Sequence, residues 1–138
     1  MGHAYIIVVG HGPDLEREGG ASNVLLGLGA RVRTLDLWDE PSLVAPADDE
    51  SVRGIVVEAI ERPDLAAMVL RSLQREPRLA KCASIVAVSH DQVARLDPSS
   101  GFDDFVLVPY VPAELYARIR NVEWRRSEFS NEERLKVG

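Results

Sequence analysis

Short apolar runs alternate along the chain with longer segments of mixed polarity. Such alternation is typical of β-α-β units, in which a parallel sheet is covered by helices. Three of the runs are almost entirely apolar, as expected for strands that are buried on both faces. The runs predict five strands, at Ala4–Val9, Arg31–Leu37, Gly54–Glu58, Ser84–Ser89 and Phe105–Val108.

Two of the intervening segments have clear helical patterns. Asp64–Gln74 carries apolar residues at helical spacing, with Pro63 before it and Pro77 after it. The final pattern, residues 113–126, has Leu115, Ile119 and Val122 on one stripe, which predicts a closing helix packed on the sheet.

The other connections contain residues that weaken helices. A first helix is expected from about Asp14 to Leu28, but Gly19 and Gly20 make its first half doubtful. Proline residues interrupt residues 38–53 and also residues 90–101. We therefore expect a short or irregular second helix and a truncated fourth helix.

Composition limits what the chain can do. A chain of 138 residues, of which 46% are apolar, fits one globular domain. The net charge of −6 argues against direct binding to DNA, because contacts to phosphates require clustered Lys and Arg. No apolar run is long enough to span a bilayer and no signal peptide is recognisable, so we expect a cytoplasmic protein. The single cysteine, Cys82, is expected to be a buried and unreactive thiol.

Ligands of open parallel sheets bind beyond the carboxyl ends of the strands. The residues that the pattern places there form the candidate site. They are Gly10, His11, Glu58, Ser89, His90 and Val108.

The segment GFDDFVLVPYVPAELYARIRNVEWRR resembles the end of response-regulator receiver domains, which commonly reads GADDYLVKPFSPEELLARIRALLRR. The resemblance covers roughly Ala4 to Arg126 and is strongest for the winged-helix subfamily, often called OmpR/PhoB-like. It implies an α/β, flavodoxin-like (CheY-like) fold with five parallel strands in the order 2-1-3-4-5 and helices on both faces. It further implies a regulatory domain that is not an enzyme and needs no cofactor.

The resemblance also implies that the phosphorylation pocket is degenerate. The metal-binding acids of the family are replaced by Gly10 and His11, since VVGHGPDL stands where VVDDEPDL is usual. Glu58 occupies the phosphoacceptor position and Val108 that of an invariant lysine. Mg²⁺ needs oxygen ligands, and phosphoryl transfer needs a cation to neutralise the phosphate oxygens. We expect neither strong Mg²⁺ binding nor ordinary aspartyl phosphorylation.

Several interpretations of these residues remain open. Glu58 either imitates the phosphorylated state in part or is a solvated strand-end acid. His11 and His90 could lie near Glu58 and form a pH-sensitive group, or they could be ordinary hydrogen-bonded histidines. Ser89 keeps the hydroxyl of the family and His90 follows it. An alternative function is a small-ligand-binding or catalytic flavodoxin-like domain that uses His11, Glu58 and His90.

The last strand and helix carry a charged face that the resemblance assigns to a homodimer. Phe105 stands at the position of the family's switch aromatic, and a solvated face is the alternative interpretation. The predicted interface consists of Asp103, Asp104, Glu114, Arg118 and Arg125. Exposed ion pairs contribute little energy, so they would select register more than affinity.

The polar residues 127–138 are interpreted as a linker, and NEERLKVG resembles the linker and first strand of a winged-helix domain. DNA would then be bound only through an effector domain absent from this chain, and a histidine kinase partner would not be required. The resemblance favours a cis Val108–Pro109 bond, which the residues alone do not decide.

Overall fold

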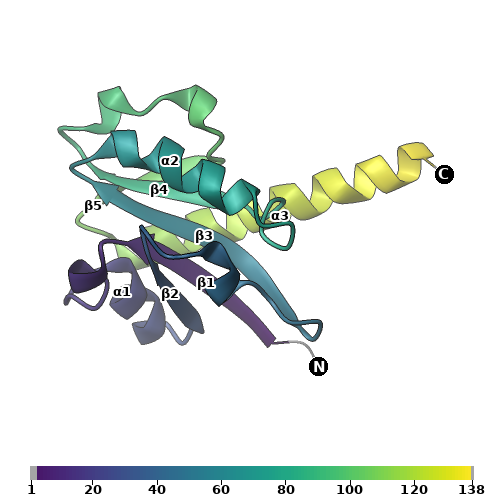
Figure 1. Ribbon diagram of the computed structural model, residues 1–138, viewed down its shortest axis with the longest axis horizontal. Coiled ribbons are helices and arrows are strands. Elements are labelled where there is room, and N and C mark those ends of the chain that lie inside the picture. Colours follow the sequence, from purple (N-terminus) through teal and green to yellow (C-terminus); the bar gives the residue numbers. More distant parts are fainter. Residues whose placement is uncertain (1–2, 138) are drawn as a thin grey trace.

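A computed structural model describes residues 3–137, with side chains from residue 3 to residue 127. It contains one five-stranded parallel sheet in the order β2-β1-β3-β4-β5 (Figure 1), which confirms the predicted fold and strand order. The strands are β1 (His3–Gly10), β2 (Val32–Asp36), β3 (Glu50–Ile60), β4 (Ser84–Ser89) and β5 (Asp104–Val108).

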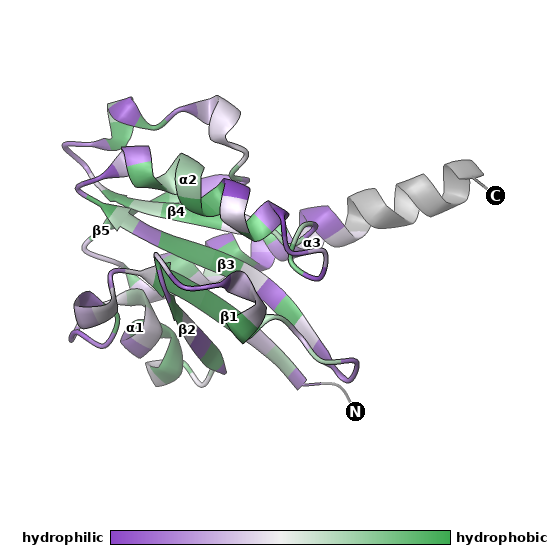
Figure 2. Cartoon of the chain, viewed as in Figure 1, coloured by the Kyte–Doolittle hydropathy of each residue, from purple (hydrophilic) through white to green (hydrophobic). Residues whose placement is uncertain are grey.

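Helices cover both faces of this sheet (Figure 1). On one face lies α2 (Pro63–Gln74), whose buried Val69 and Leu73 share an apolar core with Ile7 of β1. On the other face lie α1 (Ala21–Gly27) and α3 (Pro112–Val137), which share a second core with β1, β3, β4 and β5. Figure 2 shows the resulting pattern, with hydrophobic strands in the middle and polar residues on the outer sides of the helices. The sheet is therefore buried on both faces, as its apolar strands predicted.

The connections with helix-weakening residues form only short helical turns. The chain after β1 makes a 3-10 turn, η1 (Gly12–Asp14), and α1 begins only at Ala21, after Gly19 with a φ of 80°. The connection from β2 to β3 contains η2 (Pro41–Val44), and the connection from β4 to β5 contains η3 (Val93–Arg95) and η4 (Pro98–Ser100). The predictions of a doubtful first half, an irregular second helix and a truncated fourth helix are confirmed.

The closing helix is longer than the sequence pattern predicted. It continues through residues 127–137, so the segment expected as a linker is helical in its backbone, and no strand starts between Asn131 and Val137. Figure 1 shows this part of α3 leaving the body of the domain. The apolar stripe marked only the portion that packs on the sheet, which includes the buried Leu115, Ile119 and Val122. The domain division at residue 126 stays a prediction.

Among the described residues, no helix combines the length and the apolar character that crossing a bilayer requires. Cys82 is partly buried against the core on the α2 side, and burial raises the pKa of its thiol. The Val108–Pro109 peptide bond is cis, as the resemblance favoured.

Candidate functional site

The carboxyl ends of the strands bring most of the candidate residues to one edge of the sheet. Gly10 ends β1, Ser89 ends β4 and Val108 ends β5. Ser89 and Val108 are direct neighbours across the β4–β5 pair. Glu58 lies near the end of β3, just before the irregularity at which Ile60 takes a positive φ of 50°.

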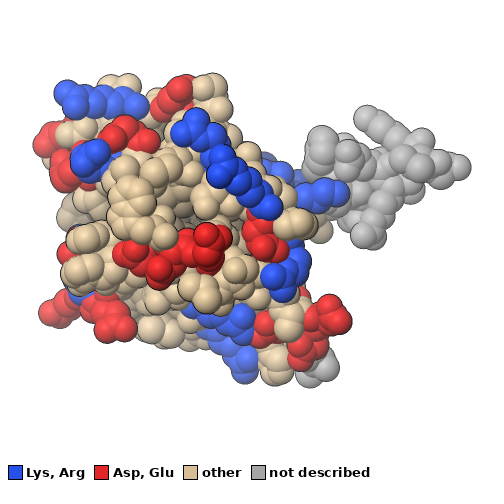
Figure 3. Space-filling model, viewed as in Figure 1, with Lys and Arg blue, Asp and Glu red and all other residues tan. Residues whose placement is uncertain are grey.

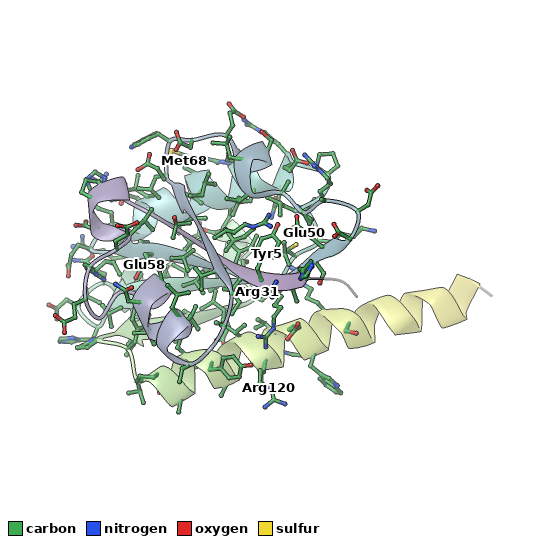
Figure 4. All side chains as sticks on the ribbon, turned by 90° about the horizontal axis from the view of Figure 1, so that it is seen from below. Tyr5, Arg31, Glu50, Glu58, Met68 and Arg120 are labelled. Carbon is green, nitrogen blue, oxygen red and sulfur yellow. The ribbon has the colours of Figure 1, made fainter. Side chains whose placement is uncertain are left out.

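Glu58 is the centre of the site. Its side chain is buried, with 7% of the residue exposed, and Figure 4 shows it beside α1. The Tyr110 hydroxyl donates a hydrogen bond to Glu58 Oε2 at 2.6 Å, and the backbone amide of Ala21 donates to the same oxygen at 3.1 Å. Arg17 Nη2 lies 3.6 Å from Oε2. The interpretation of Glu58 as a solvated acid is therefore wrong, because a buried carboxylate needs such donors.

Tyr110 joins the last strand to this carboxylate. It directly follows the cis Val108–Pro109 bond and precedes α3, and its ring packs in the core on the α1 and α3 side. Burial and the negative charge of Glu58 raise the pKa of Tyr110 far above its usual value, so the hydroxyl stays protonated and remains a donor. The sequence analysis did not single out this residue. The usable signal was a tyrosine, an aromatic residue with a hydroxyl donor, directly after the Val-Pro pair that ends the fifth predicted strand.

Arg17 was also not among the site residues predicted from the sequence. It lies in the irregular chain between η1 and α1, a segment that was expected to be the weak half of a helix. The loop brings a guanidinium to Glu58 instead. Its pairing leaves the buried carboxylate with a positive partner from the protein itself.

Gly10 provides no metal-binding group, and any side chain at this position would require its neighbours to shift. A Cβ atom at this position would lie 3.0 Å from Leu15 Cδ2 and 3.4 Å from Glu58 Cβ. The neighbouring His11 supplies an imidazole, which suits Mg²⁺ poorly, and the carboxylate of Glu58 is already engaged. The residues present therefore do not fit a magnesium ion.

Within residues 3–127, neither His11 nor His90 makes a hydrogen bond or ion pair with Glu58. His11 is exposed and lines a cavity that Glu58 also lines. The exposed ring of His90 instead pairs with Asp91, with 3.0 Å between Nε2 and Oδ1. A combined group of Glu58 with both histidines is therefore not formed among the described residues.

Ser89 and Val108 are placed differently from each other. Ser89 is buried, and its hydroxyl oxygen has no hydrogen-bond partner within residues 3–127. Val108 packs against the core on the α1 and α3 side. Val108 therefore contributes an apolar contact at the end of β5.

Asp36 and Trp38 form a second part of the site that the sequence analysis missed. The carboxylate of Asp36, at the end of β2, accepts hydrogen bonds from the backbone amides of Gly12 at 2.7 Å and Trp38 at 3.0 Å. These bonds hold the pKa of Asp36 below its usual range, and they tie the chain after β1 to the chain after β2. The side chain of Trp38 is 69% exposed. It lines the same cavity as His11 and Glu58, which has a volume of about 480 Å³.

The charged residues of the last strand and helix pair within the chain. Arg118 lies 3.2 Å from Asp104 and 3.5 Å from Glu114. Asp103 pairs with Arg126 at 2.9 Å and also accepts a hydrogen bond from the Ser84 amide. Of the remaining predicted residues, Arg125 is exposed, and Phe105 of β5 is 37% exposed.

No family model and no curated protein matches the sequence. Solved structures do match the fold, and the following are among them. The receiver domain of a sensor histidine kinase from Pseudomonas aeruginosa, described with a magnesium ion in its active-site cleft, has a TM-score of 0.65 and 15% identity over 89% of this chain and 98% of its own. A response regulator from Desulfuromonas acetoxidans has a TM-score of 0.61 and 22% identity over 87% and 95% of the two chains.

A third match is NtrX from Brucella abortus, with a TM-score of 0.64 and 17% identity. It covers 98% of this chain but only 30% of the NtrX chain. These identities are low, so the likeness concerns the fold. The chain has the fold of a response-regulator receiver domain.

Proposed function

We propose that this chain is the regulatory receiver-like domain of an atypical response regulator whose state is not set by aspartyl phosphorylation. The observation that carries the proposal is the engagement of Glu58. Its Oε2 atom accepts hydrogen bonds from Tyr110 and Ala21 and lies near Arg17. The protein itself gives this carboxylate hydrogen-bond donors and a nearby positive charge, the kinds of interaction that a phosphoryl group would otherwise require from a metal ion and neighbouring side chains.

The same contacts support a permanent link between Glu58 and the last strand. In the family that the sequence resembles, this link is made by a lysine, for which Val108 has no donor. Tyr110 lies two residues further along and reaches Glu58 at 2.6 Å. A hydrogen bond from a neutral hydroxyl to a buried carboxylate is strong and needs no second charge. The connection from the pocket to α3 is therefore kept by a different residue.

A small phosphodonor tests the proposal directly. The purified chain is incubated with acetyl phosphate and Mg²⁺, and its intact mass is measured. We expect no added phosphoryl group, because Gly10 and His11 provide no carboxylate for the metal and Glu58 is buried. A receiver domain with an intact acidic pocket, treated in parallel, is the positive control. Stoichiometric phosphorylation of Glu58 would overturn the proposal.

The output of this domain, in the same proposal, is self-association through β5 and α3. The supporting features are the charged face of Asp103, Asp104, Glu114, Arg118 and Arg125, and the partly exposed apolar residues beside it. Transcription would be controlled by a DNA-binding effector domain that is absent from this chain, and a histidine kinase would not be required. The match to part of the longer NtrX chain supports the idea of a receiver fold joined to further domains.

A further inference from the structure

The cavity at the strand ends is large enough for an organic molecule. It has a volume of about 480 Å³ and a mostly apolar lining, which includes Leu37, Ile60 and Leu65. Pockets for small molecules have this size and character, with a few polar groups that set orientation. Its walls come from the chain after β1, the chain after β2, the end of β3 and the start of α2.

One wall of this cavity presents an exposed aromatic ring on a fixed backbone. The amide of Trp38 is held by Asp36 at 3.0 Å, and the amide of Leu37 donates to the carbonyl of Gly10 at 3.0 Å. The indole itself is 69% exposed. A large apolar ring that is exposed in a hollow and carried on a fixed backbone is a ready stacking surface.

The charges around the cavity favour a positive ligand. Its two cationic residues already have carboxylate partners, since Arg17 lies by Glu58 and Arg62 makes two hydrogen bonds with Asp64 at 3.1 and 2.9 Å. The lining also contains Asp14 and Glu61. Neither has an ion-pair partner within residues 3–127, and Asp36 adds a further negative charge next to Trp38. The balance left for a ligand is therefore negative.

The surroundings of the cavity continue this arrangement. A neighbouring groove of about 270 Å³ shares Leu37 and Trp38 with it and runs between α2 and the chain after β2. Figure 3 shows that side of the molecule hollowed, with acidic side chains along one margin and basic side chains along the other. The groove is lined by Asp39 and Glu40 opposite Arg71 and Arg75. Trp38 thus stands where the cavity and the groove meet.

We propose that the strand-end cavity binds an organic cation with a flat apolar body, such as an aromatic or quaternary amine, with Trp38 as its stacking surface. The positive group is attracted by the face of the indole and by Asp14 and Glu61. The apolar body displaces water from Leu37, Ile60 and Leu65. This binding is independent of the proposed regulatory role, because it uses neither phosphorylation nor dimerisation.

A single-tryptophan variant provides the test. The chain has two tryptophans, and Trp124 is 64% exposed on α3, so Trp124→Phe leaves Trp38 as the only indole. Its fluorescence is titrated with benzyltrimethylammonium, with benzyl alcohol as the neutral probe and benzenesulfonate as the anionic probe. We expect a saturable change with the cation and an affinity at least about fivefold above that of the neutral probe, as cation–π attraction predicts. No saturation, or equal binding of the anion, would refute the proposal.

Three variants, measured by calorimetry, locate the binding. Trp38→Leu keeps an apolar side chain but removes the indole. We expect its affinity for benzyltrimethylammonium to be at least about fivefold lower than that of the parent. Glu61→Gln should lower the affinity for the cationic probe about twofold to fivefold, the range of an exposed ion pair. The affinity for benzyl alcohol should stay unchanged. Glu40→Gln is the matched control, because Glu40 lines the neighbouring groove and not the cavity. Equal effects of both glutamine variants would place binding elsewhere and contradict the proposal.

Discussion

At the scale of residues, the site is decided by which side chains satisfy one buried carboxylate. Glu58 has a tyrosine hydroxyl, a backbone amide and a guanidinium around Oε2. Tyr110 comes from the loop after β5, whereas Arg17 and Ala21 come from the connection that follows β1. These contacts explain how an acid near the end of β3 is tolerated with 7% exposure.

Removing the hydroxyl of Tyr110 tests this description. The variant Tyr110→Phe leaves the ring in the core and takes away the hydrogen bond at 2.6 Å. We expect the free energy of unfolding at neutral pH to fall by about 1–3 kcal/mol, the usual effect of leaving a buried group without its partner. Chemical denaturation followed by circular dichroism gives the value. As a control, Tyr116→Phe removes the hydroxyl that pairs with Arg53 at a half-exposed position and should change stability less. Equal losses in both variants would contradict a special role for Tyr110.

The pH dependence of stability follows from the same tyrosine. Burial and the charge of Glu58 raise the pKa of Tyr110 in the folded protein, whereas an unfolded tyrosine ionises near its usual value of about 10. Above that pH the unfolded chain loses a proton that the folded chain keeps. Stability should therefore be unaffected below about pH 9 and should fall by up to about 1.4 kcal/mol per pH unit above pH 10.

The variant Tyr110→Phe should show a shallower alkaline loss. Part of the slope will remain, because burial also raises the pKa of Tyr5. Denaturation midpoints measured between pH 8 and about pH 11 compare the two proteins. An identical alkaline slope in the variant would show that the Tyr110 hydroxyl does not keep its proton in the folded state.

At the scale of elements, the lengths of the connections set what is exposed. The link from β4 to β5 contains only the short turns η3 and η4, in which Asp97 accepts hydrogen bonds from the amide and the hydroxyl of Ser99. These turns leave the edge strand β5 incompletely covered, so Phe105 and Leu107 are 37% and 38% exposed. The connection from β2 to β3 contains only the short turn η2, and no helix covers Trp38, which is exposed.

The packing of α3 gives a stability prediction. Ile119 is 1% exposed, and its Cγ2 atom lies 3.5 Å from the point where a Cβ on Gly54 of β3 would be. Ile119→Ala should lower the free energy of unfolding by about 2–5 kcal/mol, because it opens a cavity between α3 and the sheet. Trp124→Ala, on the exposed side of the same helix, should stay within about 0.5 kcal/mol. Urea denaturation compares the two, and a loss for Trp124→Ala as large as that for Ile119→Ala would contradict this packing.

At the scale of the whole molecule, the edge formed by β5 and α3 is the surface on which we expect self-association. It combines the partly exposed Phe105 and Leu107 with a row of charges on α3. In the single chain Arg118 pairs with Asp104 and Glu114, and these groups are partly exposed, so they can exchange partners with a second copy. The apolar residues would supply most of the affinity and the ion pairs the register.

Reversing one charge tests the dimer. Arg118→Glu places a like charge beside Asp104 and Glu114. We therefore expect the dissociation constant of the dimer to be at least about tenfold higher than that of the parent chain. Analytical ultracentrifugation measures the change. Arg120→Glu is the matched control, because Arg120 is exposed and makes no ion pair within residues 3–127. A parent chain that remains monomeric at high concentration would refute self-association.

The sequence by itself determined the strands and the places where helices fail, whereas the strand order was implied by the resemblance to receiver domains. The strands and these places depend on local properties, namely apolar runs buried on both faces, proline and glycine at fixed positions, and one helical stripe that includes Leu115 and Ile119. The same reasoning placed Gly10, Glu58, Ser89 and Val108 at one edge, because parallel strands end together. Only the first part of α3 was predicted, since the apolar stripe ends at Val122 while the helical backbone continues to Val137.

The tertiary structure alone decided which groups meet at that edge. Asp36 ends β2, and Arg17, Trp38 and Tyr110 reach the site from three different loops. No periodic pattern in the chain marks a contact between such distant positions. Their side chains are selected by what a buried carboxylate and exposed backbone amides require, which depends on the closure of the whole fold.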